Sequence, residues 1–200
     1  MAVFLAASPA AAGGEEMFLL GQRSMQANNF DRAIAYFTEA LNTPDIDSKT
    51  TAAIYGWRGL AWAGKGSYDK ALEDLSQAIE KNPADGTLWL NRGSALRKKK
   101  DYGKAIEDYT AALARNPDSY AAHLYRGISW QELKNLENAL KDLSRSIEID
   151  PQRPAAYYQR ALLFIEQGDG AKALKDALRC RELDEENPYY VSLVERLQGR

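Results

Sequence analysis

An all-α fold built from repeated pairs of antiparallel helices is predicted by three features of the sequence. The segment YDKALED at residues 68–74 returns as YGKAIED at residues 102–108, thirty-four positions later. Small and large apolar residues recur at fixed offsets around one alanine in every unit, and prolines recur at the unit ends. A period of this length indicates stacked helical repeats, because one helix pair cannot bury its apolar face alone.

Five units align on a single alanine. The spacing is thirty-eight positions once and thirty-four thereafter, across Ala33, Ala71, Ala105, Ala139 and Ala173. The longer first spacing predicts a four-residue insertion within residues 43–51.

Each unit reads as two amphipathic helices joined by a short turn such as Lys65-Gly66-Ser67. The first helix carries a small residue twelve positions before the alanine: Gly21, Gly59, Gly93, Gly127 and Ala161. We expect the two helix backbones to approach each other at these small residues.

The second helix carries a side chain four positions after the alanine that is large in four units: Phe37, Leu75, Tyr109, Leu143 and, as the exception, Ala177. A small residue follows three positions later: Ala40, Ala78, Ala112, Ser146 and Cys180. The large side chains are expected to fill the space that remains between the paired helices.

The chain is expected to have three parts. Residues 14–187 form the five-unit stack, and residues 188–200 form a capping helix that begins one repeat period after Pro154. Residues 1–13 are uncharged and resemble the apolar core and cleavage site of a bacterial export signal, but lack its basic start. They are either such a signal, which would place the protein in the periplasm or outside the cell, or a disordered alanine-rich tail on a cytoplasmic protein. No later stretch approaches the ~20 apolar residues of a membrane span.

Composition excludes several functional classes. A net charge of −2 and a pI near 5.6 provide no bulk attraction to nucleic acid or an anionic membrane. One histidine and one cysteine leave no familiar metal site, and no nucleotide-binding, hydrolase or zinc-protease motif occurs. We therefore expect no enzyme activity, no cofactor, no metal site and no catalytic residues.

Arginine and aspartate recur together in units two to five. The arginines are Arg58, Arg92, Arg126 and Arg160, and each is followed sixteen positions later by an aspartate: Asp74, Asp108, Asp142 and Asp176. The first unit lacks both and has Leu20 and Tyr36 instead. Because the two positions change together, we predict a structural contact between the paired helices and not a phosphate-binding ladder.

Three other features have structural interpretations. The basic run Arg97–Lys100 ends a predicted first helix, where lysines interact well with the helix dipole, so we favour a solvated helix end over a docking site for an acidic partner. His123 takes the position of Tyr55, Trp89 and Tyr157 and is interpreted as a packing residue. Cys180 takes a small-residue position and is interpreted as buried filler.

The repeat resembles the tetratricopeptide repeat family over about residues 14–187. The motif's characteristic positions are filled by Tyr55, Trp89, Gly59, Gly93, Trp62, Trp130, Tyr68 and Tyr102. The resemblance implies a right-handed superhelical solenoid whose first helices line a concave groove. It therefore also implies a protein–protein interaction scaffold.

Carried over position by position, the groove is mostly apolar and aromatic. The predicted groove residues are Trp57, Leu60, Leu90, Asn91, Ser94, Tyr125, Ile128, Tyr158, Gln159 and Leu162, and Leu19 takes the matching place in the first unit. The dicarboxylate clamp of co-chaperone members is not present, since only Asn91 matches it. We expect the groove to bind an apolar or aromatic peptide or helix of another protein, although the same side chains could simply pack between repeats. The alternative function is a structural module that self-assembles through its ends into a homo-oligomer.

Overall fold

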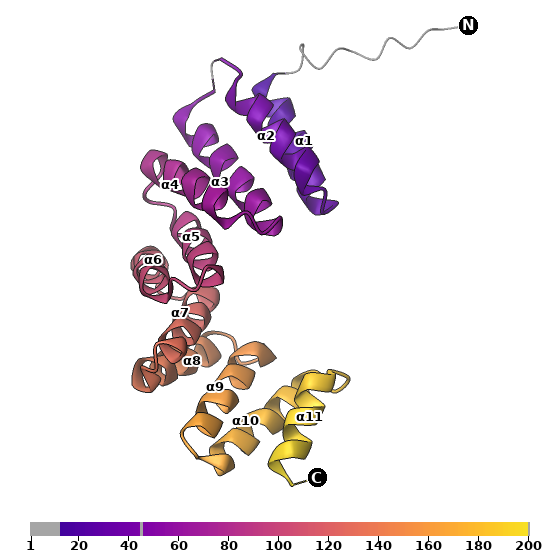
Figure 1. Cartoon of the computed structure of the whole chain (residues 1–200), viewed down its shortest axis with the longest axis vertical. Coiled ribbons are helices and arrows are strands. Elements are labelled where there is room, and N and C mark those ends of the chain that lie inside the picture. Colours follow the sequence, from indigo (N-terminus) through magenta and orange to yellow (C-terminus); the bar gives the residue numbers. More distant parts are fainter. Residues whose placement is uncertain (1–12, 45, 200) are drawn as a thin grey trace, which may run out of the picture. The chain divides into compact units, whose positions relative to one another are not determined.

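A computed structural model describes residues 13–44 and 46–199, and every regular element within those ranges is an α-helix (Figure 1). The predicted export segment falls almost entirely on residues 1–12, which lie outside the described ranges. The chain divides into two compact units, Met1–Ala95 and Leu96–Arg200. The predicted all-α class is confirmed.

The helices follow one another in the predicted order. The N-terminal unit holds α1 (Gly14–Gln26), α2 (Phe30–Leu41), α3 (Ser48–Gly64), α4 (Tyr68–Lys81) and most of α5 (Gly86–Lys98). The C-terminal unit holds α6 (Tyr102–Arg115), α7 (Tyr120–Glu132), α8 (Leu136–Ile149), α9 (Pro154–Glu166), α10 (Gly170–Leu183) and α11 (Pro188–Leu197). Within the units, α1 packs on α2, α3 on α4, α7 on α8 and α9 on α10.

The small residues lie where the paired helices approach most closely. A Cβ atom on Gly59 would lie 2.8 Å from Cγ of Leu75, and one on Gly127 would lie 3.0 Å from Cγ of Leu143. Both leucines are fully buried. Any side chain at these glycines would therefore push the helix pair apart or displace a core leucine.

The fifth unit has different residues at the two positions where the paired helices meet. Ala161 takes the place of the glycine, and Ala177 takes the place of the large residue opposite it. Both are fully buried and belong to one cluster with Leu193 and Val194 of α11. Ala161 is larger than the glycine of the other units, and Ala177 is smaller than the large residue of the other units. The two changes compensate each other in volume.

The turns inside the helix pairs share one backbone conformation. The residue two positions before each second helix has a positive φ: Asn28 at 54°, Gly66 at 76°, Lys100 at 64°, Lys134 at 59° and Gly168 at 77°. The next residue is the N-cap, and in four turns its side chain accepts a hydrogen bond from a backbone N–H three positions on: Asn29, Asp101, Asn135 and Asp169. This cap satisfies a donor that would otherwise be orphaned at the helix start.

The predicted insertion is found as extra helix. α3 has 17 residues where α5, α7 and α9 have 13 each. Its N-cap Asp47 accepts hydrogen bonds from the amides of Lys49 and Thr50. The four added residues therefore extend α3 at its N-terminus.

The predicted arginine–aspartate contact is confirmed and includes a third partner. Arg58 donates through Nε and Nη2 to the two carboxylate oxygens of Asp74, both at 2.8 Å. Its Nη1 donates to the Thr38 hydroxyl in the preceding repeat at 3.0 Å. The same three-way contact recurs in two later repeats, as Arg126 with Asp142 and Thr110 and as Arg160 with Asp176 and Ser144. Each of these arginines therefore fastens its own helix pair and ties that pair to the previous one.

Apolar residues replace this contact at both ends of the stack. In the first repeat, Leu20 and Tyr36 stand in for arginine and aspartate and pack against the cluster that contains Phe37. After the fifth repeat, Leu178 takes the hydroxyl position and Val194 of α11 takes the arginine position. The ion pair is kept in repeats that are preceded by another repeat and followed by at least one further helix.

Removing one member of the pair is predicted to destabilise the fold strongly. Asp74→Ala leaves the Arg58 guanidinium without its buried carboxylate and should lower the free energy of unfolding by about 3–5 kcal/mol. Arg58→Leu combined with Asp74→Tyr copies the first repeat's own pair and should lose less than the single change. Urea denaturation of both variants provides the comparison, and a loss below about 1 kcal/mol in Asp74→Ala would contradict a structural role.

Candidate functional site

The ten predicted groove residues all lie on first helices, and none of them is fully buried. Within the N-terminal unit, α3 carries Trp57 and Leu60, and α5 carries Leu90, Asn91 and Ser94. Within the C-terminal unit, α7 carries Tyr125 and Ile128, and α9 carries Tyr158, Gln159 and Leu162. Trp57 is 36% exposed and the other nine are half-buried.

In the N-terminal unit, exposed apolar side chains recur at one repeat position. Leu19 of α1 is 54% exposed and Trp57 of α3, at the matching position, is 36% exposed. Gly56 lets α3 approach α5 closely, since a Cβ atom there would lie 2.9 Å from Cδ2 of Leu88. The Ser94 hydroxyl donates to the Leu90 carbonyl of its own helix at 2.9 Å. This surface offers apolar contact more than polar recognition.

In the C-terminal unit, Tyr125 stands between aromatic and cationic neighbours. Its ring centre lies 6.1 Å from that of Tyr109 on α6, and the Arg97 guanidinium lies 5.0 Å from the centre of its ring. Ile128 packs on the cluster that contains Tyr120 and Leu124. Tyr125 and Ile128 thus have one side in the core and one side at the surface.

The capping helix places side chains beside two of the predicted groove residues, Tyr158 and Leu162, which the sequence analysis did not anticipate. The ring centres of Tyr158 and Tyr190 of α11 lie 5.5 Å apart, and Leu162 packs with Leu193. A cavity of about 360 Å³ is lined by Tyr158, Leu162, Pro188, Tyr189, Ser192, Leu193 and Arg196. Ser192 and Arg196 stand one repeat period after Tyr158 and Leu162, so the repeat register itself was the signal.

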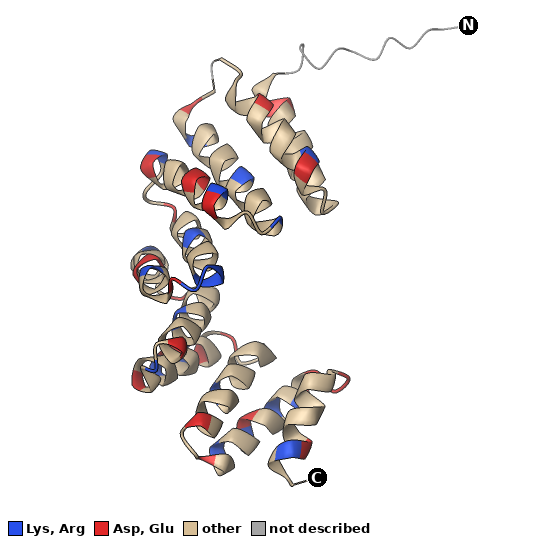
Figure 2. Ribbon diagram, viewed as in Figure 1, with Lys and Arg blue, Asp and Glu red and all other residues tan. Residues whose placement is uncertain are grey.

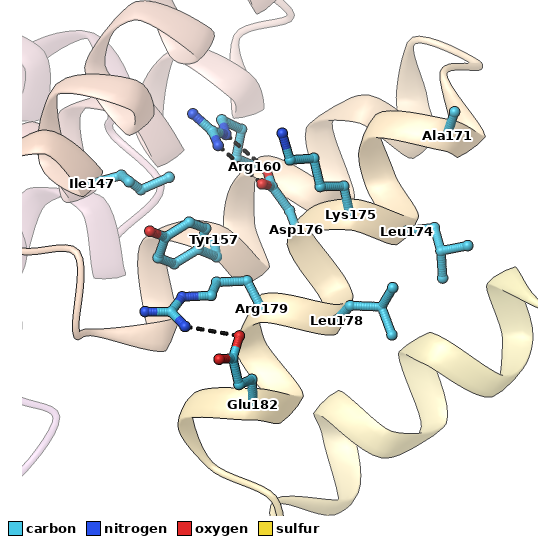
Figure 3. Close-up of a pocket in the computed structure, with 10 residues that line it drawn as sticks. All are labelled: Ile147, Tyr157, Arg160, Ala171, Leu174, Lys175, Asp176, Leu178, Arg179 and Glu182. Carbon is cyan, nitrogen blue, oxygen red and sulfur yellow. Dashed lines mark hydrogen bonds and ion pairs between the residues drawn. The ribbon is translucent and has the colours of Figure 1, made fainter.

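A larger hollow lies mainly on second helices, away from the predicted residues. It measures about 690 Å³ and involves α8, α9 and α10. Figure 3 shows its lining on two sides of α10, with Tyr157 and Arg179 on one side and Leu174 and Leu178 on the other. Arg179 pairs with Glu182, and Arg160 pairs with Asp176 (Figure 3). The hollow is therefore an open surface around α10 whose charged groups are largely engaged in structural contacts.

The single histidine of the chain is held by two acceptors. Nδ1 of His123 lies 2.9 Å from the Asp142 carboxylate, and Nε2 lies 3.1 Å from the Pro117 carbonyl. Trp89 at the matching position donates to the Pro83 carbonyl at 3.1 Å, so His123 makes a contact that belongs to the repeat.

Cys180 is fully buried in the core of the fifth repeat. Burial, with a contribution from the Asp176 carboxylate, raises the pKa of its thiol to about 12. The thiolate needed for nucleophilic or metal chemistry is therefore absent at neutral pH. No group of three His, Cys, Asp or Glu side chains that could hold a metal ion occurs among the described residues.

The family model for the tetratricopeptide repeat matches residues 18–85, 58–109 and 90–154. The chain belongs to the tetratricopeptide repeat family. This match confirms the resemblance found in the sequence, and the eleven helices within the described ranges fit about five repeats plus a capping helix.

Solved structures confirm the fold. The solved structure of MamA from residue 41 to its end, from Desulfovibrio magneticus RS-1, is 18% identical, with a TM-score of 0.77, and the match covers 88% of this chain and 97% of that one. YrrB, described as a TPR protein with an unusual peptide-binding site, is 20% identical, with a TM-score of 0.71 and coverage of 92% and 91%. No curated protein matches the chain. Among the described helices, none is long and apolar enough to cross a bilayer.

The Asp142 cluster predicts a specific dependence of stability on pH. Burial raises the pKa of Asp142, but the Arg126 guanidinium and the His123 ring together outweigh burial and hold this pKa below the ordinary value. A depressed aspartate pKa stabilises the fold above about pH 4, and that contribution is lost as the pH falls through the lower, folded-state pKa. Asp142→Asn should therefore cost about 3 kcal/mol at pH 7, and its deficit should shrink in acid.

Urea denaturation from pH 7 to pH 2 measures this deficit. Asp118→Asn is the matched control, because Asp118 pairs with Arg145 at 2.7 Å on an exposed surface and should contribute less than about 1 kcal/mol. A deficit in Asp142→Asn that stayed constant down to pH 2 would contradict the assignment.

Proposed function

We propose that this protein is a non-enzymatic scaffold that binds an apolar or aromatic segment of another protein on its first-helix surface. The anchors are Trp57 and Leu90 in the N-terminal unit and Tyr125, Ile128, Tyr158 and Leu162 in the C-terminal unit. An extended or helical segment suits such a surface, because anchors that recur with the repeat match the regular side-chain spacing of the partner.

The exposure of apolar first-helix residues carries the proposal. Leu19 and Trp57 are among the most exposed large apolar side chains described, although they occupy positions of a repeat that otherwise buries its apolar residues well. Such surfaces commonly mark interaction sites. The description of YrrB as peptide-binding supports the same use for this fold.

The expected affinity is modest. Three or four anchors at roughly 1.5–3 kcal/mol each supply ~5–10 kcal/mol before association and ordering costs. A dissociation constant of about micromolar follows. If residues 1–13 act as an export signal, the partner would be an envelope or secreted protein.

Trp57→Ala should strongly reduce capture of the partner without unfolding the protein, since its side chain is already partly solvated. Leu178→Ala is the matched control, because Leu178 has the same 36% exposure but lies on a second helix. Crosslinking pull-down from the native host, with circular dichroism of each variant, makes the comparison. If both variants lost capture of the partner equally, or if neither variant lost it, the result would contradict the first-helix surface as the binding site.

Self-assembly through the stack ends is the alternative, and one observation favours it. Tyr189 of α11 is 73% exposed. However, Glu195 takes the position where other repeats have glycine or alanine, so a further helix cannot pack on α11 as α10 packs on α9. Sedimentation at increasing protein concentration separates the two functions, and a constant monomer would eliminate assembly.

A further inference from the structure

The basic run Arg97–Lys100 at the end of α5 belongs to the C-terminal unit and departs from the repeat pattern. At the position of Arg97, the other repeats have Met25, Ala63, Gln131 and Ile165. The arginine is therefore outside the framework that fastens the helix pairs. Figure 2 shows the basic ribbon continuing from α5 into the turn before α6.

Arg97 has an incomplete set of contacts. Its guanidinium lies over the Tyr125 ring, but its Nε is buried and has no hydrogen-bond partner among the described residues. Buried donors are rarely left unpaired, because the lost hydration is not replaced. In the three arginine–aspartate pairs above, Nε and Nη2 together grip one carboxylate. No described residue supplies a carboxylate to Arg97, and its buried Nε cannot be reached from outside, so only its terminal amino groups could bind one.

Lys100 occupies a backbone position that is unfavourable for lysine. Its φ is 64°, and the matching positions hold Gly66, Gly168 and Asn28, which tolerate this conformation best. Lys134 also stands at such a position, but it pairs with Glu166 at 2.6 Å. Lys100 forms no ion pair with any described residue. A strained residue of this kind is a reason to look for a role in binding.

We propose that Arg97, assisted by Lys98 and Lys100, binds a carboxylate of the partner segment whose apolar side chains contact Tyr125 and Ile128. This inference rests on the proposed function and specifies the partner's chemistry. Because Nε is buried, the carboxylate would be held end-on by Nη1 and Nη2 in two parallel hydrogen bonds, and the Tyr125 ring, whose centre lies 5.0 Å from the guanidinium, orients the group. The sequence alone favoured a solvated helix end, but an arginine without a carboxylate partner among the described residues and the strain at Lys100 point to a bound acid.

A nucleic acid or an anionic membrane fits this patch less well. Acidic residues lie beside it: Asp101 pairs with Lys104 at 3.0 Å, and Glu132 interacts with the Tyr102 hydroxyl. These carboxylates interrupt the positive surface that a polyanion would need to follow. One acidic side chain next to apolar ones is the ligand with the best charge complementarity.

Selection from a random twelve-residue peptide library tests the inference. Wild type should enrich peptides that combine aromatic or aliphatic residues with Asp or Glu. Arg97→Met keeps the aliphatic stem on Tyr125 and should keep the apolar preference but lose the acidic one. The best peptide should bind wild type about tenfold more tightly than its Gln-for-Glu twin, and Arg97→Met should remove that difference.

Two further variants make the test independent of folding defects. Lys100→Gly relieves the positive φ, so it should raise the unfolding temperature while weakening binding of the acidic peptide about threefold. Lys141→Gln removes an exposed lysine on α8 and should change neither quantity.

The outcomes separate the carboxylate site from the proposed function. The carboxylate site would be overturned if wild type enriched apolar peptides without an acidic preference, or if the acidic preference survived Arg97→Met. Either result would remain consistent with the proposed apolar binding surface. No enrichment of any peptide would overturn both. Displacement of the acidic peptide by duplex DNA, or equal weakening by Lys141→Gln, would show general attraction of polyanions and would also overturn the site.

Discussion

The buried carboxylate on four of the five second helices makes the contact on which the stack depends. Four aspartates are buried at this position, and burying a charge is costly unless it is paired and hydrogen-bonded: Asp74, Asp108, Asp142 and Asp176. In the three described pairs the arginine supplies two hydrogen bonds to the carboxylate and a third to a hydroxyl of the previous repeat. The same side chain therefore fixes the angle within a helix pair and the distance between pairs. The surface carried by the first helices is held in place by this contact.

The position of the arginine along each first helix determines which neighbouring side chains are exposed on that helix. Each of the three arginines directly follows a predicted groove residue along its helix, namely Trp57, Tyr125 or Gln159. Because the arginine points back into the helix pair, the residue before it is turned away from that contact by the helical rotation. The repeat thus produces a row of half-exposed side chains as a consequence of its own packing. Residues at those positions contribute only part of their surface to the core, so the exposed part is available for contact with a partner.

Much of the architecture could be predicted from the sequence because the repeat supplies internal comparisons. The joint replacement of arginine and aspartate by Leu20 and Tyr36 indicated a contact between paired helices, and the longer first spacing located the added turn of α3. The hydroxyl partners were missed, since threonine and serine at a surface position have many uses: Thr38, Thr110 and Ser144.

The side chains contributed by α11 were also missed, because Ser192 and Arg196 share no chemistry with Tyr158 and Leu162. The repeat register was the one signal that placed them, and no shared residue type reinforced it. The contact partners of Arg97 were equally beyond prediction, since a basic run at a helix end has an ordinary explanation in the helix dipole.

The basic run shows why exceptions to a repeat are informative about binding. Residues that recur in every unit are explained by packing, which each unit must satisfy. Arg97 recurs in none, its Nε lacks a described partner, and Lys100 keeps a positive φ that glycine would adopt more easily. Neither feature improves the stability of the stack, and Arg97 lies against Tyr125, a residue exposed by the repeat geometry itself. Arg97 and Lys100 depart from the repeat pattern at a cost in stability, and they lie next to a surface that the repeat leaves exposed. We expect charged groups of a partner to be recognised at such positions.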